Sequence, residues 1–417
     1  MKSLWPGWRR LLNVSSSASL AAANLALSLL LLWFADASEF GSFAMLQVSA
    51  GLAYGVSNAL LGAPLLLFLK EKQPDMAQLR GFFSANLLLA LLVSAGQLLL
   101  TLGLAAAVPV MFWAPLLVFF GTLRWFGRNY ALSVNPDFAV RSDLVTSVLM
   151  LSGAAWLWSI NWLTLEGMML VCAFAQCGGL LALGRTHSGL LFRALFQREW
   201  QAVNLGMQRQ GKAALTGALS VEATTNGHSY LISLLAGPAA FAPIAAAALL
   251  FRPCFVVQGA LASYERPRLV QLLAISDGNA VRLAARQMMA WSALLWAGNA
   301  LLVAVLLIWP SHGLWEAKDN SMMFYLCVLW GVIVLLRSVR LTPSLFAQAN
   351  DQFGLLAKAC VSSALITLPL LLFLILMLDV NASLYGLIAG ELVILLWLYP
   401  SYRRLRNLSG NEVQPLC

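Results

Sequence analysis

A short stretch of the sequence places ionisable residues in an apolar setting. The first of two predicted helices within 212–261 carries Glu222, Asn226 and Tyr230, and the second carries Arg252 next to Pro253. Charged groups at membrane depth cost about 2.5–3.5 kcal/mol each, so they mark candidate functional sites. The spacing i, i+4, i+8 puts the first three side chains on one helix face, with Glu222 about 15 Å along its helix, near the midplane.

Two chemistries fit these residues. A carboxyl beside an amide and a phenol can bind a proton or a cation, so Glu222 is a candidate for ion coupling; the alternative is a carboxyl hydrogen-bonded inside the bundle. Asn226 and Tyr230, on the same face, are candidates for substrate binding. Arg252 carries a planar fork of donors that suits phosphate or a sugar phosphate. Pro253 removes a backbone donor and predicts a kink at this point. Alternatively, Arg252 pairs with Glu222 or extends to the membrane surface.

Two further arginine pairs and one acid are candidates. Arg124 with Arg128 (i, i+4) and Arg337 with Arg340 (i, i+3) each share a helix face. They could surround a cavity entrance and attract phosphate, or they could simply fix topology as positive residues on the cytoplasmic side. Glu391 lies in the middle of the last predicted helix, and its candidate roles are ion coupling and a buried polar contact.

The composition indicates an integral membrane protein. Of 417 residues, 60% are hydrophobic and 10% are charged, whereas soluble proteins have about 25% charged residues. The six cysteines have no metal or disulfide spacing. A P-loop, an HExxH motif and a nucleophile elbow are all absent from the sequence. We therefore expect no enzyme, no cofactor and no metal site.

Apolar runs of spanning length predict an all-α polytopic protein with twelve transmembrane helices. The chain is expected to form an N-lobe over 1–183, a cytoplasmic connector over 184–211, a C-lobe over 212–402 and a cytoplasmic tail over 403–417. The predicted helices are 11–34, 40–69, 81–106, 109–132, 140–160, 163–183, 212–235, 238–262, 285–308, 321–347, 355–378 and 383–402.

The positive charges support this count. Of the 26 lysines and arginines, all but Lys318 fall on one side of the predicted membrane, which is therefore the cytoplasmic side and holds both termini. The net charge of +9 is thus a topology signal, and we expect no nucleic-acid partner.

The basic connector alternates apolar and basic residues, which indicates a helix lying on the membrane surface or an ordinary basic loop.

An internal repeat divides the helices into two sets of six. The segment from Leu123, LRWFGRNYALSVNPDF, matches the segment from Leu336, LRSVRLTPSLFAQANDQF, with small gaps. Because six helices, an even number, separate the copies, the two lobes should be parallel repeats related by an axis along the membrane normal.

The polar helix 212–235, the following sequence LLAGPAAFAPIAAAALLFRP and the segment 267–269 resemble the polysaccharide flippases of the MOP superfamily, which are related to MATE transporters. The resemblance implies a V-shaped pair of lobes that move undecaprenyl-diphosphate-linked oligosaccharide across the bacterial inner membrane by alternating access. It implies that Arg252 receives the diphosphate. The first helix here is rich in serine and asparagine and lacks the arginines found there in some relatives.

The remaining implications concern partners and alternatives. The expected ligands are membrane lipid and the lipid-linked glycan. The implied protein partners are polysaccharide polymerase or export proteins. H⁺ or Na⁺ could drive the transport cycle. A MATE-type, cation-coupled exporter of small molecules would share the fold. A membrane-embedded glycan polymerase or ligase is disfavoured, because such enzymes present a large periplasmic loop and the longest outer loop here is about 310–320.

Overall fold

The structure is a computed structural model that describes residues 7–71, 76–196, 200–274, 278–308, 320–350 and 352–407. These residues form helices and connecting turns, without a strand among them. By length and composition, nine of these helices can cross a membrane, or up to 11 if each of two bent helix pairs forms one span. The helix Lys212–Leu235 has the length of a span but carries the polar group around Glu222; it corresponds to the seventh predicted helix, 212–235, and is not counted among those 11. The prediction of an all-α multi-pass membrane protein is confirmed.

The chain divides into two compact units. The first comprises Met1–Leu219 and Ser233–Ala242, and the second comprises Ser220–Ile232 and Pro243–Cys417. The helix Lys212–Leu235 is shared between the two units, so the units do not correspond to the predicted lobes. The lobe boundaries stay a prediction. The predicted loop 310–320 and tail 403–417 lie largely outside the described residues.

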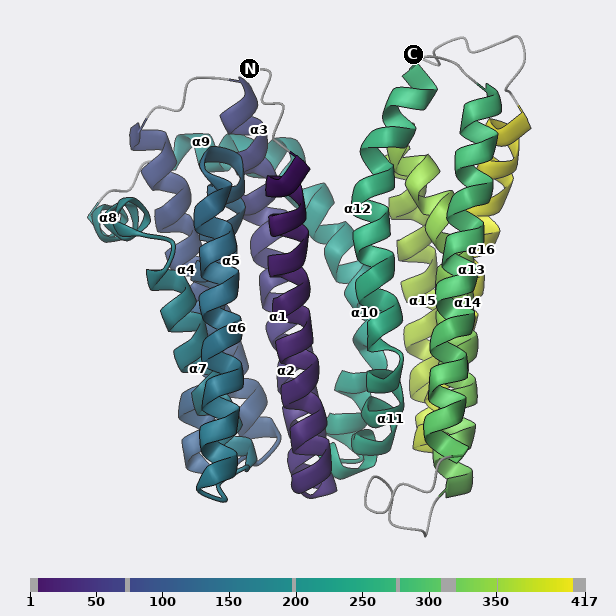
Figure 1. Ribbon diagram of the computed structural model, residues 1–417, viewed down its shortest axis with the longest axis horizontal. Coiled ribbons are helices and arrows are strands. Elements are labelled where there is room, and N and C mark those ends of the chain that lie inside the picture. The colour runs from purple at the N-terminus through teal and green to yellow at the C-terminus, as the bar shows by residue number, and fades with distance from the viewer. Residues whose placement is uncertain are drawn as a thin grey trace. The chain divides into compact units, whose positions relative to one another are not determined.

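The first unit is built from long helices that run side by side (Figure 1). The span that begins at Ala37 continues through a π-helical turn to Leu66. The elements are α1 (Gly7–Phe34), α2 (Ala37–Ser57), η1 (Asn58–Gly62), α3 (Ala63–Glu71), α4 (Met76–Gly103), α5 (Val108–Val134), α6 (Pro136–Ser159), α7 (Leu165–Leu181), α8 (Arg185–Ala194), α9 (Gln201–Gly206) and η2 (Met207–Gly211).

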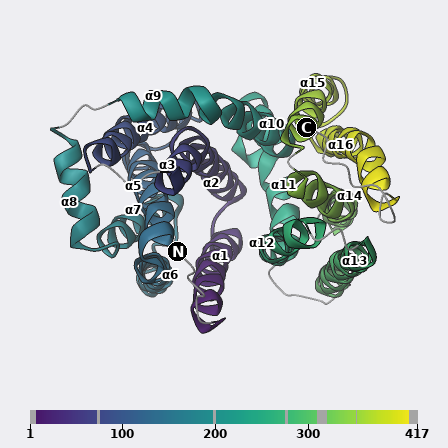
Figure 2. The ribbon, with the colours of Figure 1, turned by 90° about the horizontal axis from the view of Figure 1, so that it is seen from above.

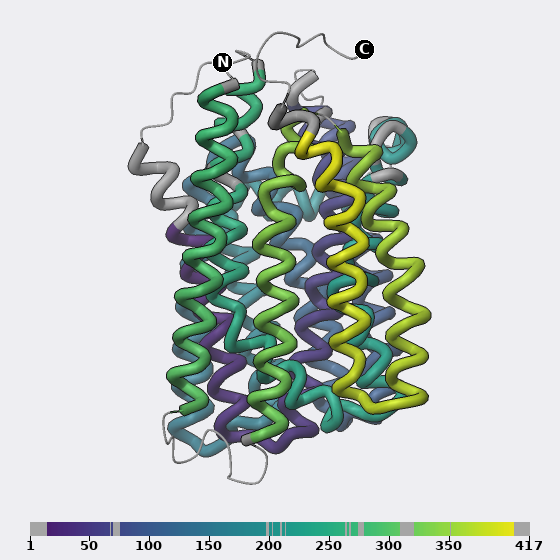
Figure 3. The backbone as a smooth tube through the Cα atoms, turned by 90° about the vertical axis from the view of Figure 1, so that its right-hand side faces the viewer, coloured from purple at the N-terminus to yellow at the C-terminus, as the bar shows by residue number. Residues whose placement is uncertain are grey.

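In the second unit the long helices α13 to α16 also run alongside one another (Figure 3). The helix predicted over 238–262 is a pair, α11 and α12, with a 51° bend at its break. The elements that lie in this unit for the larger part or entirely are α10 (Lys212–Leu235), α11 (Pro238–Leu250), α12 (Arg252–Ala274), α13 (Gly278–Ile308), α14 (Asn320–Ala349), α15 (Phe353–Met377), η3 (Val380–Ala382) and α16 (Ser383–Asn407).

Side-chain caps set the short turns between helices of the first unit. Asp36 accepts a hydrogen bond from the Glu39 N–H at 2.8 Å and starts α2. Asn135 and Thr164 cap α6 and α7 in the same way. Each cap satisfies a backbone N–H that the first turn of a helix leaves without a partner. The turn at Asn135 joins α5 directly to α6, the two helices that carry the charged cluster of this unit.

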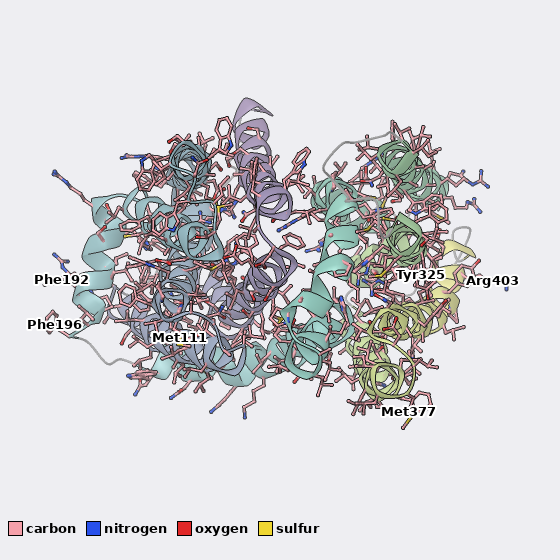
Figure 4. All side chains as sticks on the ribbon, turned by 90° about the horizontal axis from the view of Figure 1, so that it is seen from below. Met111, Phe192, Phe196, Tyr325, Met377 and Arg403 are labelled. Atoms are coloured by element: carbon pink, nitrogen blue, oxygen red, sulfur yellow. The ribbon has the colours of Figure 1, made fainter. Side chains whose placement is uncertain are left out.

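Helix α8 departs from the direction of the spans. It is bent by 101° from α7, and Gly184, at φ +94°, allows the chain to turn there. Figure 2 shows α8 side-on where α4 to α7 are seen end-on. His187 and Leu190 are buried, whereas Phe192 and Phe196 are exposed and point away from the unit in Figure 4. The amphipathic helix predicted in the connector is therefore present, and its contact with lipid headgroups stays a prediction.

Candidate functional site

The two arginines predicted on α5 share one buried carboxylate. Arg124 Nη1 lies 3.1 Å from Asp143 Oδ1, and Arg128 Nη2 lies 2.8 Å from Asp143 Oδ2. Asp143 comes from α6 and is fully buried. A buried carboxylate in contact with two guanidinium groups is held by strong charge-assisted hydrogen bonds. The arginine pair therefore serves as the counter-charge of Asp143.

Neutral partners complete this cluster. Arg124 Nε donates to Gln176 Oε1 of α7 at 2.6 Å. From α1, the Ser16 hydroxyl donates to Asp143 Oδ2 at 3.3 Å, and Arg128 Nη2 donates to the Ser17 hydroxyl at 2.7 Å. The serine-rich start of α1 is thus joined to α5 and α6 by polar contacts. The cluster ties four helices of the first unit together.

The second unit repeats the arrangement with an acid from a different helix. Arg337 Nε lies 2.7 Å from Glu391 Oε1, and Arg340 Nη1 lies 3.0 Å from Glu391 Oε2. The Arg337 guanidinium also lies 5.3 Å from the ring centroid of Phe255, a cation–π contact with α12. Glu391, a candidate for ion coupling, is buried and is already held by two positive charges. Its role in coupling stays a prediction.

The face predicted on α10 forms as expected. The Tyr230 hydroxyl donates to Glu222 Oε1 at 3.2 Å, and the Asn226 side chain also reaches this carboxyl. Within the described residues Glu222 forms no ion pair, with Arg252 or with any other cation. His228 is buried against Trp330, with ring centroids 5.9 Å apart. Glu222 is thus a partly buried carboxyl with neutral partners, suited to bind a cation or proton.

Arg252 differs from the other four predicted arginines. It is the first residue of α12, directly after the bend, and it is partly buried. Across the parts of the chain that the structure describes, its guanidinium forms neither a hydrogen bond nor an ion pair. A guanidinium at membrane depth without a counter-charge is unfavourable unless a ligand or water neutralises it. Its five N–H groups are therefore open to an anion.

Sequence reasoning missed three polar residues: Asp143 and Gln176, which hold the arginines of the first unit, and Asn299 of α13, which bonds to the backbone on both sides of Arg252. All three are buried and lie inside predicted spans. Their polarity within an apolar span is the feature of the sequence that could have identified them as functional or structural residues. The described ranges contain no group of three His, Cys, Asp or Glu side chains placed to hold a metal ion.

Comparison of the structure with solved proteins identifies its fold. A multidrug resistance MATE family transporter of the MOP superfamily, in an inward-facing conformation, matches with a TM-score of 0.66 and 12% identity, covering 94% of this chain and 96% of that one. The lipid II flippase MurJ, in an inward closed conformation, matches with a TM-score of 0.67 and 11% identity, covering 94% and 87% of the two chains.

The Vibrio cholerae MATE transporter VcmN, as a mutant, matches with a TM-score of 0.60 and 14% identity over 97% of this chain and 96% of that one. No protein-family model and no curated protein matches the sequence. The chain has the fold that MATE transporters share with MurJ, so the predicted resemblance to the MOP superfamily is confirmed for the fold.

Proposed function

We propose that this chain, with its MOP-superfamily fold, moves a diphosphate-linked oligosaccharide lipid across the bacterial inner membrane by alternating access. The observation that carries the proposal is the unpaired guanidinium of Arg252. The other four predicted arginines are held by Asp143 or Glu391, so their charges are largely compensated. Arg252 alone of the five keeps its charge for a ligand.

A diphosphate fits this position chemically. It carries several negative oxygens, and a guanidinium can bind two of them in parallel. The lipid chain would stay in the bilayer while the charged group and the glycan contact the protein. The fold is shared with a lipid II flippase, which supports a lipid-linked ligand, and with MATE transporters, which supports the general transport cycle.

The binding test compares two arginines of the second unit. We expect Arg252→Ala to weaken the binding of undecaprenyl diphosphate to the detergent-purified protein by about tenfold or more, because hydrogen bonds to charged groups contribute about 1.5–3 kcal/mol. Arg286→Ala, at an exposed position on α13, serves as the matched control and should bind normally. Undiminished binding by the Arg252 variant would remove its proposed role.

Glu222 is the residue that we assign to ion coupling, and it also bears on the second candidate function, a cation-coupled exporter of small molecules. We propose that it binds the driving H⁺ or Na⁺, since it has neutral partners rather than a counter-ion. Glu222→Gln should abolish the dependence of transport into vesicles on a pH or sodium gradient, and unchanged coupling would reject this role.

The same carboxyl could instead bind an organic cation, as in an exporter of small molecules. Two measurements separate the functions. Deletion of the gene should remove surface polysaccharide and leave sensitivity to cationic drugs unchanged if the flippase proposal is right. The opposite result, with gradient-driven efflux of a cationic dye that Glu222→Gln abolishes, would favour the exporter.

A further inference from the structure

The break between α11 and α12 interrupts one specific helical hydrogen bond. In a continuous α-helix the N–H of Cys254 would donate to the carbonyl of Leu250, four residues earlier. Instead, the Asn299 side chain of α13 lies between these two groups. Its Oδ1 accepts from the Cys254 N–H at 3.1 Å, and its Nδ2 donates to the Leu250 carbonyl at 3.1 Å. The Cys254 N–H also donates to the Phe251 carbonyl, three residues earlier, at 3.1 Å, so the amide takes the place of the i−4 bond while a tighter i−3 bond remains.

The inserted amide also explains how the break is tolerated inside an apolar bundle. Pro253 has no N–H to donate, and a kink leaves neighbouring backbone groups without helical partners. Such groups are costly in a membrane unless another helix satisfies them. Asn299 is buried, with 8% of its surface exposed, and an amide offers the required donor and acceptor together.

Arg252 lies between the two backbone groups that the amide holds. The bend of 51° therefore decides the direction in which the first residue of α12 projects. We propose that Asn299 is a positioning residue that holds Arg252 in its ligand-accepting orientation by keeping this helix open. This inference deepens the proposed function and rests on it for the identity of the ligand, but the effect of Asn299 on the bend does not depend on any ligand.

The bend can be measured directly. Spin labels at the exposed positions Ala239 and Ala260 flank the break, and a straight helix of this length would separate their backbones by about 3 Å more than a helix bent by 51°. Asn299→Ala and Asn299→Leu each free Cys254 and Leu250 to bond with each other, so the measured distance should lengthen toward the straight value.

Trp296→Phe is the matched control for the label experiment. It removes the hydrogen bond from Trp296 Nε1 to the Gly331 carbonyl, 2.9 Å long, one turn earlier on the same helix and away from the break. The distance should stay at its original value in this variant. An unchanged distance in both Asn299 variants, or an equal change in the control, would overturn the proposal.

The link to Arg252 is tested by undecaprenyl diphosphate binding in a double-mutant cycle. Asn299→Ala should weaken binding about tenfold when Arg252 is present and should have no further effect on Arg252→Ala. A residue that only stabilises the fold would lower binding by the same factor in both backgrounds, and that result would reject positioning. If the unmodified protein does not bind this lipid, the proposed function fails, whereas the label distances still decide the role of Asn299.

Discussion

Replacing Asp143 by asparagine tests how the charges of the first unit are balanced. The substitution keeps the size of the side chain and removes its negative charge. Arg124 and Arg128 would then lie within hydrogen-bonding distance of a neutral amide instead of a carboxylate, at positions where the ion-pair distances are now 3.1 and 2.8 Å. Two buried guanidinium groups would remain without a counter-charge and would repel each other.

The size of the effect follows from burial. Removing one partner of a buried ion pair costs about 3–5 kcal/mol, because the other charge stays buried and uncompensated. Asp143 is fully buried and both arginines are nearly so, so water can offer little compensation. We therefore expect Asp143→Asn to lower the free energy of unfolding by about 3–5 kcal/mol. The exposed Asp379, which accepts from Asn381 at 2.8 Å, is the control, and Asp379→Asn should cost about 0.5 kcal/mol or less.

The assay is unfolding of the purified protein in mixed micelles with increasing sodium dodecyl sulfate, followed by circular dichroism. A second substitution sharpens it. Gln176 already accepts from Arg124 at 2.6 Å, so Gln176→Glu would return one carboxylate to the cluster from α7. The double variant Asp143→Asn/Gln176→Glu should recover most of the lost stability. Unfolding of Asp143→Asn at the original detergent fraction, or a further loss in the double variant, would refute the reasoning.

Three other predictions concern packing and charge. Glu391→Gln should destabilise the second unit by about 2–3 kcal/mol in the same titration, somewhat less than Asp143→Asn because one of its two arginines keeps 24% of its side chain exposed. Gly41→Ala should lower the free energy of unfolding by about 1–3 kcal/mol, because a methyl group there would overlap the Pro238 backbone carbonyl. Gly51→Ala is the control: a methyl group there meets nothing within 4 Å, so thermal unfolding should be unchanged or slightly delayed. Phe196→Trp should add emission that lipids brominated near the headgroup quench, if α8 lies on the membrane surface, and absence of quenching would place α8 elsewhere.

The helices could be predicted from the sequence because their signal is local. A span needs about 20 apolar residues, and each predicted range coincides with a helix of the structure or, for 40–69 and 238–262, with consecutive helical segments. The ends moved by a few residues, as for the range 81–106, which is observed as Met76–Gly103. Polar residues near helix ends are compatible with either a last turn or a loop, so hydropathy alone does not fix a boundary.

The partners of the charged residues could not be predicted, because pairing depends on how helices rotate against one another. Arg124 and Arg128 were recognised as sharing a face, but nothing local indicates that this face meets Asp143 of the next helix. In the second unit the corresponding acid is Glu391, which belongs to the last helix rather than to the one that follows the arginines. The role of Asn299 could not be predicted for the same reason, because it depends on α13 lying against the break between α11 and α12.

The two arginine clusters bear directly on Arg252. Each unit brings one carboxylate to an arginine pair, and the two units do so from different helices, so the fold has more than one way to neutralise a buried guanidinium. Glu222 belongs to the same unit as Arg252, yet its carboxyl is held by Tyr230. An uncompensated charge at this depth costs about 2.5–3.5 kcal/mol. Four of the five predicted arginines are compensated by a carboxylate and the fifth is not, and this difference is why we propose Arg252, rather than the arginine pairs, as the anion site.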